Sequence, residues 1–189
     1  MRKQRGLSLF AGVVFAFLFI PLGIITVTAF GENPTIQFPI TGFTFGWFTA
    51  VFENQAFIDS FLLSLEVSLL ATFFALVIGI PAAYALTRQG VKGKNWIKSF
   101  FLSPTIIPGV VVGYSLFQFI VIRLQVPLFQ GLLLGHFLIS IPYIIRVVGS
   151  SLEQLDFSIE EVAWTLGSTK IKAFTSIVLP NISSSIFAA

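Results

Sequence analysis

Long stretches without a charged residue dominate the pattern of apolar and polar positions along this chain. A helix that crosses the hydrocarbon core of a bilayer needs about 20 predominantly apolar residues. Windows of that length predict membrane-crossing helices at Leu7–Phe30, Val67–Thr87, Ser99–Ile122 and Leu124–Ile145. The pattern therefore predicts an all-α fold, a polytopic transmembrane helical bundle with about four to five spans present.

Charged residues are scarce and lie mainly at the ends of these windows. They make up 10% of the chain, against roughly 25% in soluble domains. The basic residues lie before the first window, between the second and third, and after the fourth: Arg2, Lys3, Arg5, Arg88, Lys92, Lys94, Lys98, Lys170 and Lys172. Of the other two intervening segments, one has no Lys or Arg and the other has only Arg123. The positive-inside rule therefore places the N-terminus and the segment after the fourth window in the cytoplasm.

The residue content argues against several kinds of chemistry. The net charge of +3 is dispersed over span ends, so nucleic acid is not an expected partner. The chain has no cysteine, which removes disulfides, thiolate nucleophiles and Cys-based metal sites. The single histidine, His136, has no ligand partners at metal spacing, and neither HExxH nor GxSxG occurs. We expect no catalytic residue, no metal, no cofactor and no enzymatic activity.

Small residues recur every four positions along the second predicted span, at Ala71, Ala75, Gly79 and Ala83. In a helix this spacing forms one stripe on which another backbone can approach closely. The stripe predicts tight helix packing, either within this chain or against another membrane subunit. The prolines in every window also favour a bundle of interrupted or kinked helices around a pathway.

Two features on the outer side have open interpretations. Glu66 lies near the outer start of the second span, where a carboxylate is a candidate for binding a cationic substrate or is simply a group that reaches water. The segment from Gly31 to Asp59 interleaves aromatic residues with Gly and Pro. It is typical of an ordered loop at the membrane interface, or of a surface for a partner protein.

The segment after the last window predicts two short helices joined by a glycine turn. Ser158 and Glu161 have capping-box spacing, Gly167 can end the helix in a left-handed conformation, Ser168 can cap a second helix, and Pro180 suits the first turn of another. Such short helices are marginal in water. The apolar residues on the first helix therefore need a docking partner: Ile159, Val162, Ala163 and Leu166.

The same segment resembles a known motif. The residues that carry it are Glu161, Val162, Ala163, Gly167, Ile177, Leu179 and Pro180. Their spacing resembles the cytoplasmic EAA loop of permease subunits in binding-protein-dependent ABC importers, with Val162 where the family usually has alanine. The stretches Phe101–Pro104, Pro108–Gly109 and Ile141–Val148 also look like the spermidine/putrescine-type branch of these permeases.

This resemblance implies a transmembrane permease domain over residues 1–189, with a cytoplasmic coupling loop at 151–180. It implies a multi-pass protein of the bacterial inner membrane that lines part of a translocation pathway for a polyamine or another small polar solute. The implied partners are an ABC ATPase, a second permease subunit, an extracytoplasmic substrate-binding protein and the lipid bilayer. The residues after Pro180 are too few for another span, so the chain is expected to be incomplete at its C-terminus relative to the family. The alternatives are a non-transporting truncated scaffold or fragment, and a membrane-embedded hydrolase.

Overall fold

The structure is a computed structural model that describes residues 2–88, 93–102 and 107–189. Lys92, Ser103 and Pro104, on which parts of the sequence interpretation rest, lie outside these residues. Within the described ranges the chain forms helices and turns and no strand. It divides into two compact units, one ending at Leu62 and one running from Leu63 to Ala189.

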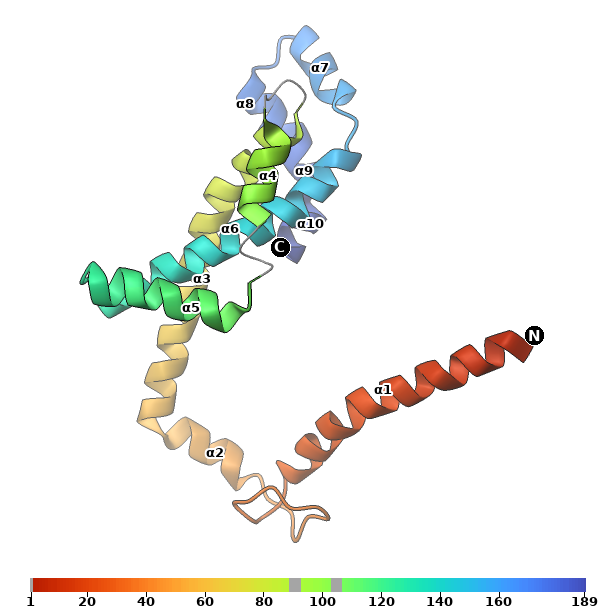
Figure 1. Cartoon of the computed structure of the whole chain (residues 1–189), viewed down its shortest axis with the longest axis vertical. Helices are drawn as coiled ribbons and strands as arrows, with labels where there is room; N and C mark the ends of the chain where they lie inside the picture. Colours follow the sequence, from red (N-terminus) through yellow and green to blue (C-terminus); the bar gives the residue numbers. More distant parts are fainter. Residues whose placement is uncertain (1, 89–92, 103–106) are drawn as a thin grey trace. The chain divides into compact units, whose positions relative to one another are not determined.

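The first unit contains α1 (Arg2–Thr28), α2 (Gly46–Glu53) and the start of α3 (Gln55–Thr87), labelled in Figure 1. The segment between α1 and α2 is held by packed aromatic rings. The Phe30 and Phe43 rings stack with centroids 5.5 Å apart, and the indole Nε1 of Trp47 donates a 2.9 Å hydrogen bond to the Gly31 carbonyl. The prediction of a loop over Gly31–Asp59 is wrong for its second part, because residues 46–53 form α2 and α3 begins at Gln55.

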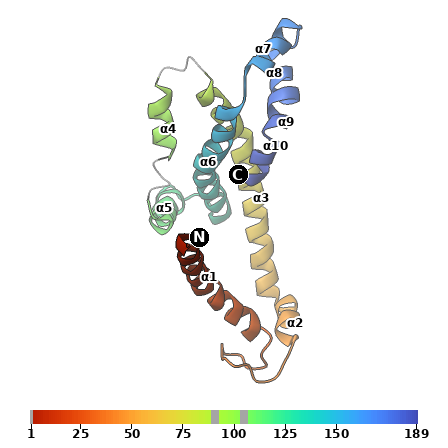
Figure 2. The same ribbon diagram turned by 90° about the vertical axis from the view of Figure 1, so that its right-hand side faces the viewer.

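The second unit contains the rest of α3 and the remaining elements. They are α4 (Lys94–Leu102), α5 (Gly109–Leu116), the π-helix η2 (Phe117–Arg123), α6 (Leu128–Gln154), α7 (Ser158–Thr165), α8 (Lys170–Ala173), the π-helix η3 (Phe174–Val178), α9 (Leu179–Asn181) and α10 (Ser183–Ala188). Figure 2 shows α7 and α8 at the end of this unit where α6 finishes.

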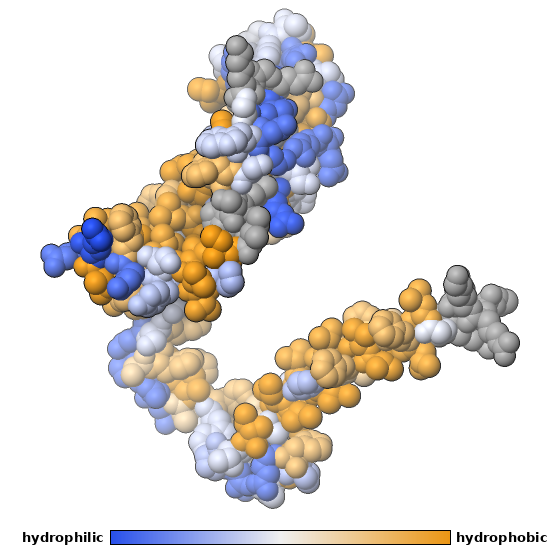
Figure 3. All heavy atoms as spheres, viewed as in Figure 1, coloured by the Kyte–Doolittle hydropathy of each residue, from blue (hydrophilic) through white to orange (hydrophobic). Residues whose placement is uncertain are grey.

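Three helices in the described part of the chain are long and apolar enough to cross a membrane: Gly6–Thr28, Gln55–Thr87 and Leu128–Gln154. Apolar side chains cover α1 in Figure 3, and none of its most hydrophobic window is buried within the chain. A surface of this kind matches lipid better than water.

The third predicted window, Ser99–Ile122, does not form one helix. Helix α4 ends at Leu102, and a shorter apolar helix, Gly109–Arg123, begins after Pro108. Proline has no amide hydrogen and restricts the residue before it, so a helix readily begins directly after Pro108. Pro127 has the same role at the start of α6, where its ψ of 146° is extended.

The small-residue stripe on α3 packs inside the second unit. Ala75, Gly79 and Ala83 are all buried. A Cβ placed on Gly79 would lie 2.7 Å from Cγ2 of Ile144 on α6, a distance that real Cβ contacts essentially never show. Of the two packing partners that the sequence left open, the described contacts at Gly79 favour a helix of the same chain.

The core of this unit lies where α3, α6 and the final helices meet. Its largest fully buried apolar side chains come from α6, η3 and the residue after α9: Ile144, Ile145, Val148, Leu152, Val178 and Ile182. The segments before and after α7 and α8, which are α6 and η3 to Ile182, therefore share one core with α3.

Candidate functional site

Helix α7 begins directly after a short turn that follows α6. The carboxylate Oδ1 of Asp156 accepts a 3.0 Å hydrogen bond from the backbone N–H of Ser158. This backbone bond holds the pKa of the exposed Asp156 carboxyl below its ordinary value.

The predicted capping box of Ser158 and Glu161 is wrong. Ser158 is already the first residue of α7, and the N-cap residue before it, Phe157, makes no side-chain capping bond. The Glu161 amide, which Ser158 would need to cap, donates instead to the Phe157 carbonyl at 3.2 Å. The helix therefore starts one residue earlier than a capping box at Ser158 requires.

Gly167 ends α7 as predicted. Its φ is +88°, the left-handed region in which only glycine avoids steric strain. Ser168 N–H bonds to the Ala163 carbonyl at 2.9 Å and Gly167 N–H to the Trp164 carbonyl at 3.0 Å. These two bonds make a Schellman motif.

The cap of α8 is Thr169 rather than the predicted Ser168. The Thr169 hydroxyl accepts a 3.3 Å hydrogen bond from Lys172 N–H, and its ψ of 156° is the extended backbone that an N-cap needs. The amide of Ser168 is still part of the turn that closes α7, so the next residue starts α8. Pro180 lies in the first turn of α9 as predicted.

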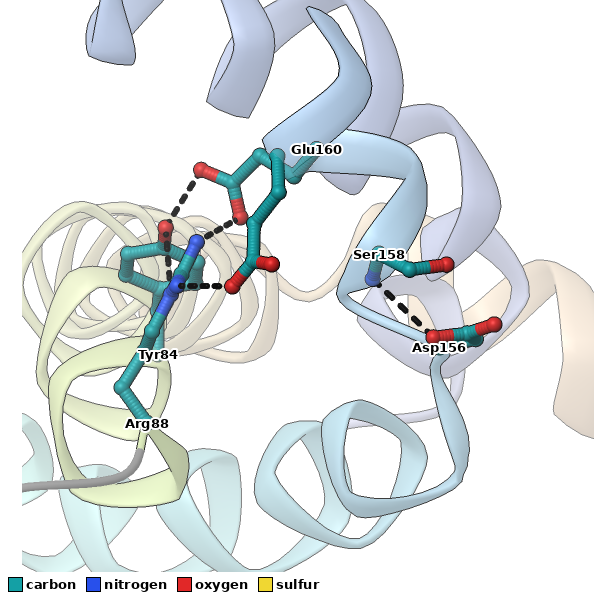
Figure 4. A network of polar contacts seen from close by, with 6 residues as sticks. Tyr84, Arg88, Asp156, Ser158 and Glu160 are labelled. Carbon is teal, nitrogen blue, oxygen red and sulfur yellow. Dashed lines mark hydrogen bonds and ion pairs between the residues drawn. The ribbon is translucent and has the colours of Figure 1, made fainter. Parts of the chain in front are cut away.

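One face of α7 is buried against the end of α3. Glu160 has no exposed side-chain surface, and its carboxylate faces Tyr84 of α3 and Arg88, the residue after α3, in Figure 4. The Tyr84 hydroxyl donates to Glu160 Oε1 at 2.6 Å, and Arg88 donates to Glu160 Oε2. The Nε of Arg88 donates to the Tyr84 hydroxyl at 3.1 Å. These three residues are called the latch below.

Aromatic rings enclose the cation of the latch. The Arg88 guanidinium carbon lies 4.7 Å from the ring centre of Trp164, 4.9 Å from that of Phe157 and 5.4 Å from that of Tyr84. Burial lowers the pKa of Arg88, but hydrogen bonds with Tyr84 and Glu160 more than offset this and raise it above its ordinary value. The guanidinium is permanently charged, and its partner Glu160 belongs to a different helix.

The opposite face of α7 is exposed and apolar. Val162 is 56% exposed and Leu166 82% exposed, with Ile159 beside them and Ile171 on α8 also exposed. Ala163 is half-buried. The Glu161 side chain is 64% exposed, and its carboxylate lies 3.9 Å from an Arg88 nitrogen. The exposed set is called the apolar face below and consists of Ile159, Val162, Leu166 and Ile171.

The other motif residues anchor the loop. Ile177 and Leu179 are half-buried, and Leu179 packs against the core of the second unit. The seven motif residues therefore do not form one cluster. Three lie on α7, Gly167 forms the turn after it, and the other three lie in η3 and α9.

Sequence reasoning missed Tyr84, Arg88 and Glu160 as a group. The available signals were the spacing of Tyr84 and Arg88, one helical turn apart, and that of Phe157, Glu160 and Trp164 along one face of α7 and its N-cap. No sequence rule joins two such faces across 72 residues.

Two further candidates lie away from the loop. Glu66 is exposed on α3. The ring Nδ1 of the exposed His136 lies 2.9 Å from the Leu132 carbonyl, one turn earlier on its own helix. Within the described ranges, no group of His, Asp and Glu could hold a metal ion.

This fold and loop define a membrane transport component. Residues 75–189 match the family described as "Binding-protein-dependent transport system inner membrane component". Because the match covers more than half of the chain, the chain belongs to that family.

Individual relatives agree with this assignment. The chain is 30% identical over 181 residues to the putrescine transport system permease protein PotI of Escherichia coli K12, covering 92% of this chain and 64% of PotI. It is 28% identical over 172 residues to the spermidine/putrescine transport system permease protein PotC of Haemophilus influenzae, covering 90% of this chain and 66% of PotC. The chain therefore spans just under two thirds of the length of these relatives.

A solved structure shows the same fold. It is a crystal structure of a bacterial ABC transporter involved in the import of the acidic polysaccharide alginate. The TM-score is 0.70 with 14% sequence identity, and the match covers 100% of this chain and 69% of that one.

Proposed function

We propose that this chain is a permease subunit of a bacterial ABC importer, and that its coupling loop at 151–180 docks a separate ATPase subunit. The observation that carries the proposal is the apolar face. Val162 and Leu166 are exposed on a helix whose other face is fixed to α3 by the buried Glu160. A rigid, exposed apolar surface loses little conformational entropy when a partner covers it.

The proposed partners are those of the importer class: an ABC ATPase, a second permease subunit and an extracytoplasmic binding protein. Relatives named for putrescine and spermidine transport support a polyamine, or another small polar solute, as the substrate. The basic residues at span ends support an inner-membrane orientation with the N-terminus and the loop in the cytoplasm. In this proposal the chain moves solute and catalyses no reaction itself.

Affinity purification of the tagged chain from detergent-solubilised membranes tests the docking surface. The test variant is Leu166→Asp, which places a charge at the most exposed position of the apolar face. Its control is Ser176→Asp, which introduces the same charge at an exposed polar position of η3. Mass spectrometry identifies the retained proteins.

We expect an ABC ATPase to be retained by the wild-type chain and by Ser176→Asp, and to be lost from Leu166→Asp. Absence of an ABC ATPase from the wild-type sample would overturn the proposal and favour a scaffold. Substrate class is tested separately, by measuring whether putrescine with its binding protein stimulates ATP hydrolysis by the reconstituted complex more than an uncharged polar solute does.

A further inference from the structure

We infer that Arg88 and Glu160 are positioning residues that make the docking helix α7 and the inner end of α3 move as one body. This inference rests on the proposed function, because it concerns how force from the ATPase reaches a membrane helix. Neither residue is among the motif residues recognised from the sequence.

The burial of Glu160 requires that its contacts with Tyr84 and Arg88 stay formed. The Glu160 side chain has no solvent exposure and that of Arg88 has 22%. A carboxylate taken out of water is strongly disfavoured unless it is paired and hydrogen-bonded. Both Glu160 oxygens are satisfied, one by the Tyr84 hydroxyl on α3 and the other by Arg88, the residue after α3. Helix α7 therefore cannot leave α3 without exposing or orphaning these groups.

The contacts also fix orientation, which a single ion pair does not do. The guanidinium is planar, and the rings of Phe157 and Trp164 lie 4.9 and 4.7 Å from its central carbon. A planar cation that is stacked and hydrogen-bonded loses its freedom to rotate. Tyr84 is also packed edge-on against Phe157 and Phe174, with ring centroids 6.0 and 4.9 Å apart.

The part of α3 that carries Tyr84 packs closely against α6. Five residues before Tyr84, the backbone of α3 at Gly79 lies against Ile144 of α6 with no room for a Cβ. Ala83, beside Tyr84, is 1% exposed within the core. A displacement of α7 by a docked ATPase is therefore transmitted to the packed α3–α6 pair rather than absorbed in the loop.

The test separates docking from transmission. The chain is reconstituted into proteoliposomes with its ATPase, second permease and binding protein, and solute uptake is measured per ATP hydrolysed. The main variant is Glu160→Gln, which keeps the size of the side chain and removes its charge. The matched control is Glu153→Gln, which breaks the 2.6 Å ion pair between Lys98 on α4 and Glu153 on α6, where both side chains are more exposed.

For Glu160→Gln we expect retained ATPase binding and at least about a tenfold fall in uptake per ATP, because the half-buried Arg88 loses the buried carboxylate with which it is paired. For Glu153→Gln we expect a change below about twofold, as for exposed pairs. The double variant Arg88→Glu with Glu160→Arg restores opposite charges at the two positions. It should recover part of the coupling that Arg88→Glu alone loses.

A spectroscopic measurement distinguishes positioning from general destabilisation. In a Trp47→Phe, Trp96→Phe background, Trp164 is the single tryptophan of the chain, and it reports on the guanidinium stacked on it. Its emission should stay unchanged on ATPase binding when the latch is intact, and should shift in Glu160→Gln.

Unchanged uptake per ATP in Glu160→Gln would overturn the inference. So would loss of the ATPase from that variant with no recovery in the charge-swapped pair, which would make the latch a structural support only. Absence of an ATPase from the wild-type chain is a different result, and it overturns the proposed function instead.

Discussion

The glycine turn between α7 and α8 offers a prediction that can be worked out from the backbone alone. Gly167 has a φ of +88°, and a Cβ added there would meet nothing within 4 Å. A substitution therefore meets no steric obstacle from neighbouring atoms. Its cost is the left-handed backbone, about 1–2 kcal/mol for an ordinary L-residue.

The cost arises in the loop conformation in which residue 167 has a left-handed backbone, and we propose that this conformation binds the ATPase. If a substituted residue leaves the left-handed region to relieve the strain, binding of the ATPase must restore that conformation. An affinity loss of about 5- to 30-fold for the ATPase then follows from about 1–2 kcal/mol in Gly167→Ala. Asparagine tolerates left-handed backbone better, and valine is β-branched and tolerates it worse. The expected order of affinity is Gly, Asn, Ala, Val.

The assay is equilibrium binding of the purified ATPase to the chain in nanodiscs, by biolayer interferometry. Gly135→Ala is the matched control, because that glycine also has nothing within 4 Å of a built Cβ and lies within α6 without a positive φ. It should bind as the wild type does. Equal affinities for the Asn, Ala and Val variants at position 167 would refute the reasoning, because the strain of a left-handed backbone depends on the side chain.

Three other changes test separate contacts. Gly79→Leu should weaken the packing of α3 on α6 by about 1–3 kcal/mol, measured as thermal unfolding in detergent, whereas Gly135→Leu enters open space and should change it less. Glu161→Lys puts a cation beside Arg88, 3.9 Å from the present carboxylate, and should reduce ATPase copurification without changing resistance to carbonate extraction. Because the pKa of Asp156 is lowered, its support of α7 is complete above about pH 4 and is lost as the pH falls through the lowered value. Hydrogen exchange of the α7 amides, corrected for intrinsic rates, should show that loss in the wild type and not in Asp156→Asn.

Much of the fold follows from the apolar windows, because hydropathy over about 20 residues reports the cost of placing a chain in lipid. The windows at Leu7–Phe30 and Val67–Thr87 each coincide with part of a long helix. The window at Ser99–Ile122 failed as one helix because a hydropathy count treats Pro108 as one more uncharged residue. Its effect is on the backbone, which hydropathy does not measure.

In the loop, too, features set by a residue itself could be predicted from the sequence, and features set by distant contacts could not. Gly167 and Pro180 were predictable, since a left-handed turn and a missing amide are properties of the residue itself. The role of Glu160 was not predictable in this way. Its burial depends on Arg88 and Tyr84, which are 72 and 76 residues away in the sequence. The capping-box spacing satisfied the local rule, but α7 already begins at Ser158, with Phe157 at the N-cap position.

The packing of α3 on α6 has a consequence for the entropy of assembly. The α3 face consists of Ala75, Gly79 and Ala83, whose side chains have no rotamers to lose. Facing them, Ile144 and Val148 are β-branched and largely confined to one rotamer in any helix. The two helices therefore lose little side-chain conformational entropy when they pack together. In lipid, where no hydrophobic effect draws helices together, such an interface can form on dispersion contacts alone.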